Sequence, residues 1–350
     1  DTLLVGAPYG LMPDVFGEPT DDSGAIYIMQ RTGAVWNQQQ KILAGDSADA
    51  DEFGRAVAIF GEMIVAGAPA EGDALDPAPV DAGAVYSYQV MPTNVQKLMA
   101  SVQHDSADFG AAVAVDGDWV VVGAPYDDVG ALTNIGSAYV FRRVNAQWTE
   151  FAQLIADPAS NPEPGDWFGG AVAIDGDWLV VGARNKNVAG GPNGDGAIYI
   201  YHFDGSQWVP HSTFLQDAFT GVASQDHFGT SVAITNDTIL VGAPDWGSSD
   251  KGTAWVLRWN DPAWVLEDQL QPPDYATLPT GANFGYSVDL DGDTAGIAAR
   301  YAHAAYVFTR DGGGAWSYED KITVASDVES VAVSSDSLLI GELTTASVYT

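Results

Sequence analysis

Apolar and polar residues alternate along this chain in short runs, and the runs return in the same order about every sixty residues. The unit that starts at Phe109 contains four such runs, at 109–115, 119–125, 136–141 and 148–155. The pair Asp116-Gly117 separates the first two runs, and residues 143–146 separate the last two. A period of two residues is typical of strands, and a tight turn containing Asp-Gly is typical of a hairpin. We therefore predict a four-stranded antiparallel meander for this unit.

The same order of runs can be followed through the rest of the chain. Segments equivalent to the first strand lie at 53–59, 168–174, 228–234, 284–290 and, in degenerate form, 328–333. The fourth strand usually opens with tryptophan, at Trp36, Trp148, Trp208, Trp264 and Trp316. No stretch shows a convincing 3.6-residue period, so little helix is expected. Repeated four-stranded meanders form a β-propeller, and seven copies predict an all-β, seven-bladed propeller in a single domain over residues 1–350.

Two short motifs mark the units. Phe-Gly begins at Phe53, Phe109, Phe168, Phe228 and Phe284, and Gly-Ala-Pro or a decayed copy begins at Gly6, Gly67, Gly123, Gly182, Gly242, Gly296 and Gly341. This unit resembles the bacterial FG-GAP repeat family, whose animal relatives form the seven-bladed propeller at the head of integrin α chains. The resemblance covers essentially the whole chain and implies the same fold. Proteins with this repeat serve adhesion, lectin and structural roles, so the resemblance leaves the function open.

The two ends of the repeat array are expected to be incomplete. The first unit begins at its second strand, residues 2–5, and the last unit stops after its third strand, residues 347–349. In propellers of this kind the N-terminal strand usually completes the last blade, so both missing strands are expected upstream of Asp1. Either the sequence is part of a longer chain, or a neighbouring copy supplies the strands by strand addition and the protein forms a fibre.

Charge and composition narrow the choice of partners. The chain has 47 acidic and 13 basic residues and a formal net charge of −34, which repels nucleic acids and anionic lipid head groups. It has no cysteine, which excludes disulfides and cysteine-based zinc sites. No apolar stretch approaches the roughly 20 residues that span a bilayer. We expect a protein outside the cell or at its surface that binds no nucleic acid and does not insert into a membrane.

Strand order predicts that the two faces of the propeller differ. Loops from the second to the third strand and from the fourth to the next first strand share one face, and the tight turns share the other. Most acidic residues fall in the loops, with only four basic ones, Arg184, Lys186, Lys251 and Arg300. Because binding residues concentrate on loops of rigid scaffolds, this face is predicted to bind a protein or glycan ligand. The candidate residues are Asp14, Glu18, Asp21, Asp22, Asp73, Asp76, Asp81, Asp127 and Asp128. The alternative is that these acidic loops are solvated turns.

Aromatic residues in the same loops support a lectin as the alternative function. Tyr9, Tyr126 and Trp246 fall there, together with Trp167 and Tyr275, and such rings stack on sugars. The first three follow a Gly-Ala-Pro motif by one or two residues. Part of this arrangement is therefore expected from the repeat itself.

The resemblance also raises the question of calcium. Integrin-like repeats often carry Asp-x-Asp-x-Asp-Gly between the first two strands, whereas this chain has Asp116-Gly-Asp, Asp175-Gly-Asp and Asp291-Gly-Asp at that place. Two carboxylates in a tight turn are too few for the 6 to 8 oxygens that calcium prefers. We predict plain hairpin turns there and no certain cofactor, while calcium bound by the acidic loops stays an alternative.

The sequence offers little support for catalysis. Most carboxylates recur in register with the repeat, as expected of scaffold residues, and the histidines, His104, His202, His211, His227 and His303, occupy different positions in their units. Neither a His-Glu-x-x-His nor a Gly-x-Ser-x-Gly motif occurs. We predict a non-enzymatic binding or structural protein without catalytic residues. A hydrolase on the same scaffold is the less favoured alternative.

Overall fold

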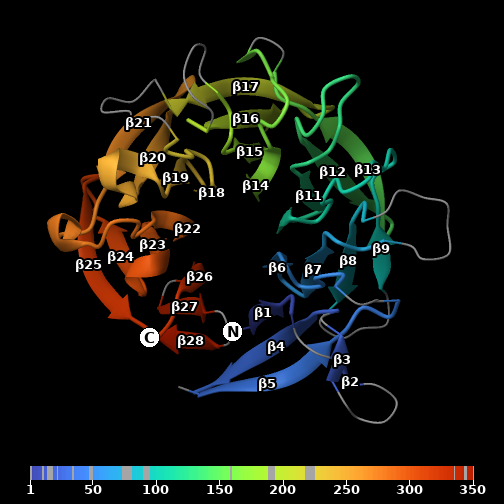
Figure 1. Ribbon diagram of the computed structural model, residues 1–350, viewed down its shortest axis with the longest axis horizontal. Coiled ribbons are helices and arrows are strands. Elements are labelled where there is room, and N and C mark those ends of the chain that lie inside the picture. The colour runs from blue at the N-terminus through green and yellow to red at the C-terminus, as the bar shows by residue number, and fades with distance from the viewer. Residues whose placement is uncertain are drawn as a thin grey trace. The chain divides into compact units, whose positions relative to one another are not determined.

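The computed structural model describes residues 2–9, 12–13, 19–21, 23–33, 35–46, 50–72, 81–89, 95–157, 160–187, 194–216, 225–334, 336–342 and 345–349. These residues form antiparallel sheets (Figure 1). The chain divides into two compact units, Asp1–Ala156 with Trp167–Val172, and Asp157–Asp166 with Ala173–Thr350. The single domain predicted over residues 1–350 stays a prediction.

The first unit contains three of the repeated sheets and a small hairpin. The first sheet has three strands, β1 (Thr2–Ala7), β4 (Ala25–Thr32) and β5 (Val35–Ile42). The second has four, β6 (Val57–Phe60), β7 (Met63–Ala68), β8 (Ala84–Gln89) and β9 (Gln96–Leu98). The third consists of β10 (Ala112–Asp116), β11 (Trp119–Ala124), β12 (Ser137–Val144) and β13 (Gln147–Leu154). Strands β2 (Met12–Pro13) and β3 (Pro19–Asp21) pair in the small hairpin.

The second unit contains the remaining sheets, although the first residues of β14 belong to the first unit. The fourth sheet consists of β14 (Phe168–Asp175), β15 (Trp178–Ala183), β16 (Ala197–Phe203) and β17 (Trp208–Leu215). The fifth consists of β18 (Ser231–Thr235), β19 (Thr238–Ala243), β20 (Thr253–Asn260) and β21 (Ala263–Leu270). The sixth consists of β22 (Phe284–Asp291), β23 (Thr294–Ala299), β24 (Ala304–Arg310) and β25 (Trp316–Thr323). The seventh has three strands, β26 (Val328–Ser334), β27 (Ser337–Glu342) and β28 (Ala346–Tyr349).

Seven meanders in chain order confirm the predicted all-β, seven-bladed propeller, with three described strands in the first and last blades. Helical turns in the described residues are short: η3 (Trp246–Asp250), η4 (Tyr275–Thr277) and η5 (Arg300–Ala302). The hairpin turns predicted from Asp-Gly are also confirmed, since Asp116 pairs with Trp119 and Asp291 with Thr294. The turn predicted at 143–146 is shorter than expected. Val144 still pairs with Gln147, so only two residues make that turn.

The two sequence motifs interlock neighbouring blades, and glycine is required for steric reasons. In the first unit, a Cβ atom on Gly123 would lie 1.9 Å from the carbonyl oxygen of Gly169 in the next blade. A Cβ atom on Gly67 would lie 2.0 Å from that of Gly110. The amide of Gly110 also donates a hydrogen bond to the Gly123 carbonyl at 3.0 Å. In the first unit the Phe-Gly backbones at Gly54 and Gly110 therefore each pack on two Gly-Ala-Pro segments, that of their own blade and that of the preceding blade.

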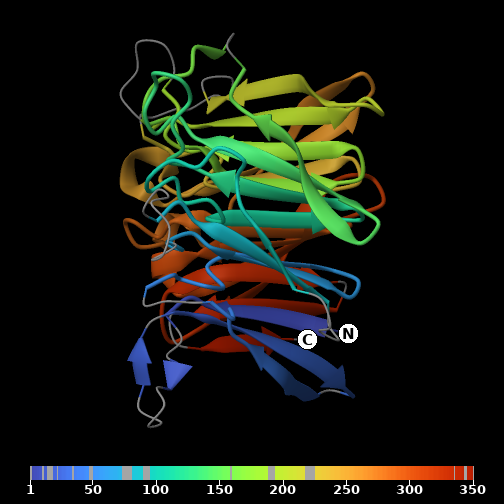
Figure 2. The same cartoon turned by 90° about the vertical axis from the view of Figure 1, so that its right-hand side faces the viewer.

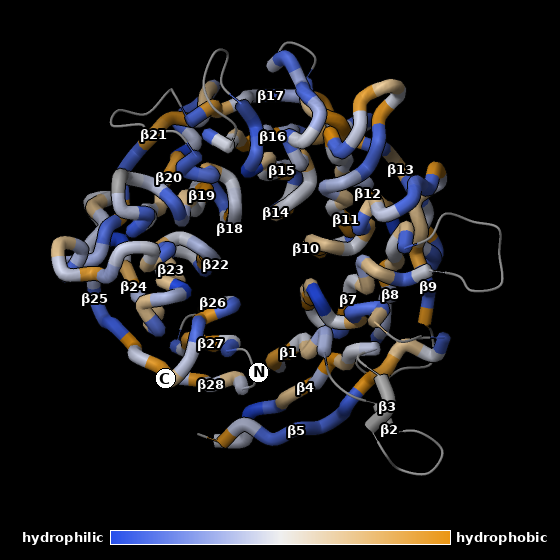
Figure 3. Tube along the Cα trace, in the orientation of Figure 1, coloured by the Kyte–Doolittle hydropathy of each residue, from blue (hydrophilic) through white to orange (hydrophobic). Residues whose placement is uncertain are grey.

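The phenylalanine of each Phe-Gly anchors its own blade in the core. Phe53, Phe109 and Phe284 are at most 1% exposed, and each meets the ring of the tyrosine on the third strand edge-on at 5.4 Å. Second strands such as β7 and β11 are almost fully buried, whereas outer strands such as β5 are largely hydrophilic (Figure 3). The hydrophobic core thus lies in the inner part of the blades, so the loops that connect the strands can differ from one blade to another.

Candidate functional site

Each sheet has two unlike ends. The second strand connects to the third, and the fourth to the next blade, at the end called here the loop end. The hairpin turns lie at the other end, called the hairpin end, as the β10–β11–β12–β13 sheet shows (Figure 2). Most of the candidate residues from the sequence belong to loop ends. The geometry there decides which side chains are available to a ligand.

One backbone position at the loop end repeats almost identically in five blades. The residue before Phe-Gly is left-handed each time, with φ of +58° at Glu52, +55° at Asp108, +58° at Trp167, +54° at His227 and +53° at Asn283. A left-handed backbone costs a non-glycine residue about 1–2 kcal/mol. The backbone is therefore constant while the side chain changes from carboxylate to indole, imidazole and amide. Of these five residues only Trp167 was a predicted binding residue, and the position that they share was not recognised from the sequence, although it directly precedes every Phe-Gly.

In the first unit, Tyr9 lies with two charged residues of the next blade. Arg55 donates to the Tyr9 hydroxyl at 3.1 Å, and that hydroxyl donates to Glu52 at 3.4 Å. Tyr9 remains 53% exposed. Arg55 also forms an ion pair with Glu52 at 3.4 Å. The structure therefore adds Arg55 to the basic residues of the loop ends.

Asp108 lies close enough to other carboxylates for its ionisation to be disturbed. The pKa of Asp108 is raised to about 6, chiefly by burial and also by the negative charges of Glu52 and Asp81, while Arg55 acts in the opposite direction. Asp81, a predicted binding residue, is exposed. The negative charge at this loop end is thus only partly balanced by protein groups.

The predicted aromatic residue Tyr126 lies against Trp167. Their ring centroids are 5.2 Å apart in an edge-to-face arrangement, and both side chains are half-buried. Trp246 packs differently, since its ring meets Trp255 edge-on at 6.4 Å and its indole N–H is buried without an acceptor among the described residues. Of these rings, Tyr9, Tyr126 and Trp167 keep surface for stacking in the first unit.

Asp127 and Asp128, although adjacent in sequence, have different environments. Asp127 is 1% exposed and accepts hydrogen bonds from the Tyr139 hydroxyl at 2.7 Å and the Gln153 amide at 3.2 Å. Its other oxygen contacts His104 Nδ1 at 2.5 Å. Asp128 is partly exposed and accepts from the backbone of residue 134 at 2.8 Å. Asp127 therefore supports the loop from inside, and Asp128 is the more accessible of the two.

Some of the predicted binding residues fall outside the described ranges. Asp14, Glu18, Asp22, Asp73 and Asp76 lie outside the described residues, and Asp21 is described only as part of β3.

Two lysines of fourth strands, Lys97 and Lys321, reach the loop ends. These contacts were not predicted from the sequence. Lys97 lies between Asp46, at 2.8 Å, and Glu71, at 2.7 Å, and over the ring of Tyr86. Burial opposes ionisation of Asp46, but Lys97 and Tyr86 outweigh burial and lower its pKa. In the second unit Lys321 pairs with Asp274 in the same way at 2.6 Å. A carboxylate of one connecting loop is thus tied to the next blade.

A fully buried ion pair holds the loop end of the fourth blade in the second unit. Lys186 and Asp166 are each 1% exposed, and Lys186 Nζ lies 3.0 Å from Asp166 and 2.7 Å from the carbonyl of Asn161. Burial raises the pKa of Asp166, although hydrogen bonds and Lys186 counteract it. Lys186, which the sequence places among the loop charges, is therefore part of the interior.

Two further clusters lie at loop ends of the second unit. Asp245 bridges His227, at 2.6 Å, and the side-chain amide of Asn283 in the next blade. Arg300 forms an ion pair with Glu329 at 2.8 Å, and its guanidinium lies 4.5 Å from the ring centroid of Tyr286. Residues at the left-handed position thus contact the neighbouring loops through different chemistry in each blade.

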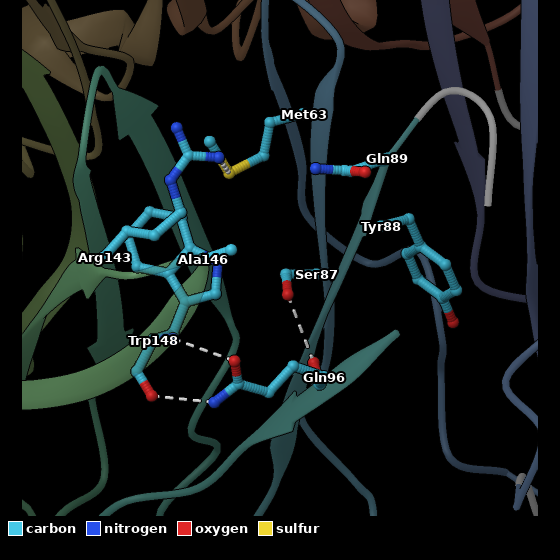
Figure 4. A pocket seen from close by; sticks show the side chains of 8 residues that line it. All are labelled: Met63, Ser87, Tyr88, Gln89, Gln96, Arg143, Ala146 and Trp148. Carbon is cyan, nitrogen blue, oxygen red and sulfur yellow. Dashed lines mark hydrogen bonds between the residues drawn. The ribbon is translucent and has the colours of Figure 1, made fainter. Parts of the chain in front are cut away.

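A small pocket lies between the second and third blades of the first unit, toward the hairpin end (Figure 4). Gln96 closes its base by a double hydrogen bond with the backbone of Trp148, at 2.7 and 2.9 Å. Arg143 forms one wall, where it contacts Met63 Sδ at 3.8 Å and pairs with Asp118. These contacts join neighbouring blades, so we assign the pocket no ligand.

Metal and membrane chemistry find no support in the part of the chain that the structure describes. In these ranges no group of three or more His, Asp or Glu side chains is placed to hold a metal ion. No helix within the described ranges is long and apolar enough to span a bilayer. Calcium binding by the acidic loops stays a prediction.

Comparison with known families identifies the repeat. The family described as FG-GAP repeat matches residues 36–88, 92–141, 148–201 and 220–257, which is more than half of the chain. This chain belongs to the FG-GAP repeat family. No curated protein matches the FG-GAP chain.

Solved structures resemble the FG-GAP chain in fold at low sequence identity. A protein from Lactobacillus plantarum is 13% identical with a TM-score of 0.61, covering 100% of this chain and 91% of its own. The Cps50 (Swd1) β-propeller domain from Myceliophteria thermophila is 11% identical, TM-score 0.61, with coverage of 93% and 89%. A candidate 6-phosphogluconolactonase from Bacteroides uniformis is 12% identical, TM-score 0.61, with coverage of 99% and 91%. At these identities the likeness extends to the fold alone.

Proposed function

We propose that this FG-GAP protein is a non-enzymatic binding module, acting outside the cell or at its surface, that recognises its ligand through the loop ends of its blades. One observation carries the proposal. Five blades keep φ between +53° and +58° at the residue before Phe-Gly, while the side chain differs in every one of them. A constant backbone with varied side chains is typical of a scaffold that presents a binding surface.

Backbone strain supports a role for these side chains. Glycine would adopt the left-handed conformation without the cost of about 1–2 kcal/mol that other residues carry. Stability alone would therefore favour glycine at Glu52, Asp108 and Trp167. Strained residues are frequent at functional sites, where the side chain justifies the strain.

Charge favours a basic segment of a protein ligand. The formal charge is −34, and several of the basic residues already pair inside the protein, including Lys97, Lys186 and Lys321. In the first unit burial, together with the negative charges of Glu52 and Asp81, raises the pKa of Asp108 to about 6. A Lys or Arg side chain of a partner would relieve this repulsion and would also be attracted from a distance.

A glycan ligand is the second candidate, favoured by one observation. Tyr126 and Trp167 form a half-buried edge-to-face pair at a loop end of the first unit, and Tyr9 of the same unit is 53% exposed. Aromatic faces beside carboxylates offer both stacking and hydrogen-bond acceptors to a sugar.

A parallel screen separates the two ligand classes. The protein is applied to an array of glycans and to an array of peptides that differ in Lys and Arg content, each at low and high salt. We expect binding to basic peptides that weakens as salt rises. Binding to glycans that Trp167→Ala abolishes would favour the lectin instead, and absence of binding to both arrays would count against a binding module.

The structural alternative concerns assembly. Polymer formation by strand donation between copies stays a prediction, tested by electron microscopy of the native protein for filaments. For the hydrolase alternative we propose no catalytic residues.

A further inference from the structure

Strand β22 carries Asp289 where the first strands of the four preceding blades carry alanine, and Ser287 where three of those four carry alanine. Three residues after the Phe of Phe-Gly stand, in blade order, Ala56, Ala112, Ala171, Ser231 and Ser287. Five residues after it stand Ala58, Ala114, Ala173, Ala233 and Asp289. Small residues suit a crowded inner strand. Asp289 therefore departs from the repeat at a place where a charge is costly.

Both polar side chains of β22 bind the backbone of the seventh blade. The amide of Val331 donates to Ser287 Oγ at 3.1 Å, and the amide of Val333 donates to Asp289 Oδ2 at 2.7 Å. Strands β22 and β26 lie side by side in the second unit (Figure 1). Strand β26 is the edge strand of its sheet, where N–H groups lack a neighbouring strand. Ser287 and Asp289 supply the missing acceptors.

The seventh blade needs such contacts because it lacks the usual interlock. Val328 stands where the other blades have the Phe of Phe-Gly, and no glycine follows it. Val328 is fully buried in a small apolar cluster shared with the sixth blade, and Arg300 pairs with Glu329 at 2.8 Å. Docking of this blade therefore rests on a few side-chain contacts.

We propose that Ser287 and Asp289 form a clasp that docks the seventh blade onto β22, and that acidification tightens this docking. The geometry behind the second part is the position of the carboxylate, which is half-buried where β22 meets β26 and accepts from the Val333 amide. Its hydrogen bonds come from the backbone amides of Val333 and Leu290, and its own strand adds the negative Asp291. Burial is the largest influence and raises the pKa of Asp289 to about 6, against the effect of the two amides.

The elements packed against β22 offer Asp289 no compensating cation. Strands β18, β19 and β23 carry no ionisable side chain. On β20, Arg258 is paired with Asp237 at 2.6 Å. Glu329 of β26 and Arg300 of η5 are paired with each other.

The sign of the pH dependence follows from linkage. In an undocked blade Asp289 would have an ordinary aspartate pKa of about 3.9, below its docked value. The docked state therefore binds a proton more tightly than the undocked state. Docking strengthens as the pH falls from 7.5 to 5, and this gain is lost as the pH rises through 6.

Hydrogen exchange of the β26 amides, followed by mass spectrometry on the whole chain, tests the proposal. After correction for the intrinsic pH dependence of exchange, protection of residues 328–334 in the wild-type protein should rise about tenfold between pH 7.5 and pH 5. Asp289→Asn keeps an oxygen acceptor but removes the charge. Its protection should be independent of pH and, at pH 7.5, at least as high as that of the wild type.

Two controls complete the experiment. Asp291→Asn makes the same charge change on the exposed neighbour and should leave the pH dependence in place. Ser287→Ala should lower protection of residues 328–334 at both pH values. Protection that does not change with pH in the wild type would overturn the proposal even if no variant folds. Lower protection of Asp289→Asn at pH 7.5 would show that the charged carboxylate holds the strand, and an unaffected Ser287→Ala would remove Ser287 from the clasp.

Discussion

At the scale of single residues, the glycines of this chain were predictable as repeat markers, but not their reason. The alternation of Gly and Ala indicates a crowded inner strand, and the structure places a glycine Cα of one blade against a carbonyl of the next. The left-handed residue before Phe-Gly was not predictable, because Glu, Asp, Trp, His and Asn share no chemical pattern. The contacts of Asp127 and Lys186 were not predictable either, because burial of a charged side chain depends on partners distant in sequence.

Gly123→Ala should unfold or severely destabilise the protein. The new Cβ atom would lie 1.9 Å from the Gly169 carbonyl oxygen, which belongs to the backbone and cannot turn aside, and 3.3 Å from the Cβ of Ala112. We expect a loss of about 3 kcal/mol or more in the free energy of unfolding. Gly45→Ala is the matched control, because nothing lies within 4 Å of a Cβ there. Thermal unfolding measures both, and equal stability of the two variants would refute the interlock.

Asp108→Asn should stabilise the protein at neutral pH but not in acid. Because burial and Glu52 raise the pKa of Asp108 to about 6, the folded state binds this proton more tightly than the unfolded state. Stability attributable to this group therefore falls as the pH rises from about 4 through 6. We expect a gain of about 1–2 kcal/mol at pH 7.5 that shrinks toward pH 4. Denaturant titration at both pH values, with the exposed Asp177→Asn as a charge-matched control, checks it, and a gain independent of pH would contradict it.

At the scale of elements, most of the fold could be predicted. Four-stranded meanders and tight Asp-Gly hairpins follow from alternation and turn residues, and the structure confirms them. The ties between connecting loops and neighbouring blades could not be predicted. Lys97 forms ion pairs with Asp46 and Glu71, which are far from it in sequence. A local sequence pattern cannot predict which distant residues form such a pair.

The two residues of the buried ion pair in the fourth blade, Lys186 and Asp166, should be energetically coupled. Lys186→Met leaves the Asp166 carboxylate buried without its cation, which typically costs about 3–5 kcal/mol. The double variant Lys186→Met with Asp166→Asn removes the charge of both partners and should recover a large part of that loss. A double-mutant cycle from denaturant unfolding gives the coupling. If the double variant were as unstable as the sum of the single ones, the pair would not act as a unit.

At the scale of the whole molecule, the charge of −34 is the dominant property and was evident from composition. Which carboxylates are accessible was not evident, because some pair with lysines and others are buried. Asp81 and Asp128 remain accessible candidates, whereas Asp127 is enclosed.

Salt and calcium should stabilise the protein in distinguishable ways. Screening of self-repulsion predicts that the melting temperature rises when sodium chloride increases from low to physiological concentration. Calcium bound by the acidic loops would add a further rise at millimolar concentration beyond that of sodium chloride at equal ionic strength. Differential scanning calorimetry separates the two effects. If calcium raises the melting temperature no more than sodium chloride does, the calcium alternative is removed. If sodium chloride does not change the melting temperature, an uncompensated charge is contradicted.

The central claim is that the left-handed position before Phe-Gly is kept for binding. Its most direct test is a glycine scan of that position, Glu52→Gly, Asp108→Gly, Trp167→Gly, His227→Gly and Asn283→Gly, with Kd measured for the ligand from the arrays and Tm measured alongside. The account predicts that Glu52→Gly and Asp108→Gly keep or raise Tm, since the strain is relieved, while at least one variant of the scan weakens binding tenfold or more, which is about 1.4 kcal/mol. Gln207→Ala at a hairpin end should change neither quantity. Full binding by all five variants, or loss of binding from the hairpin-end variant alone, would contradict the account.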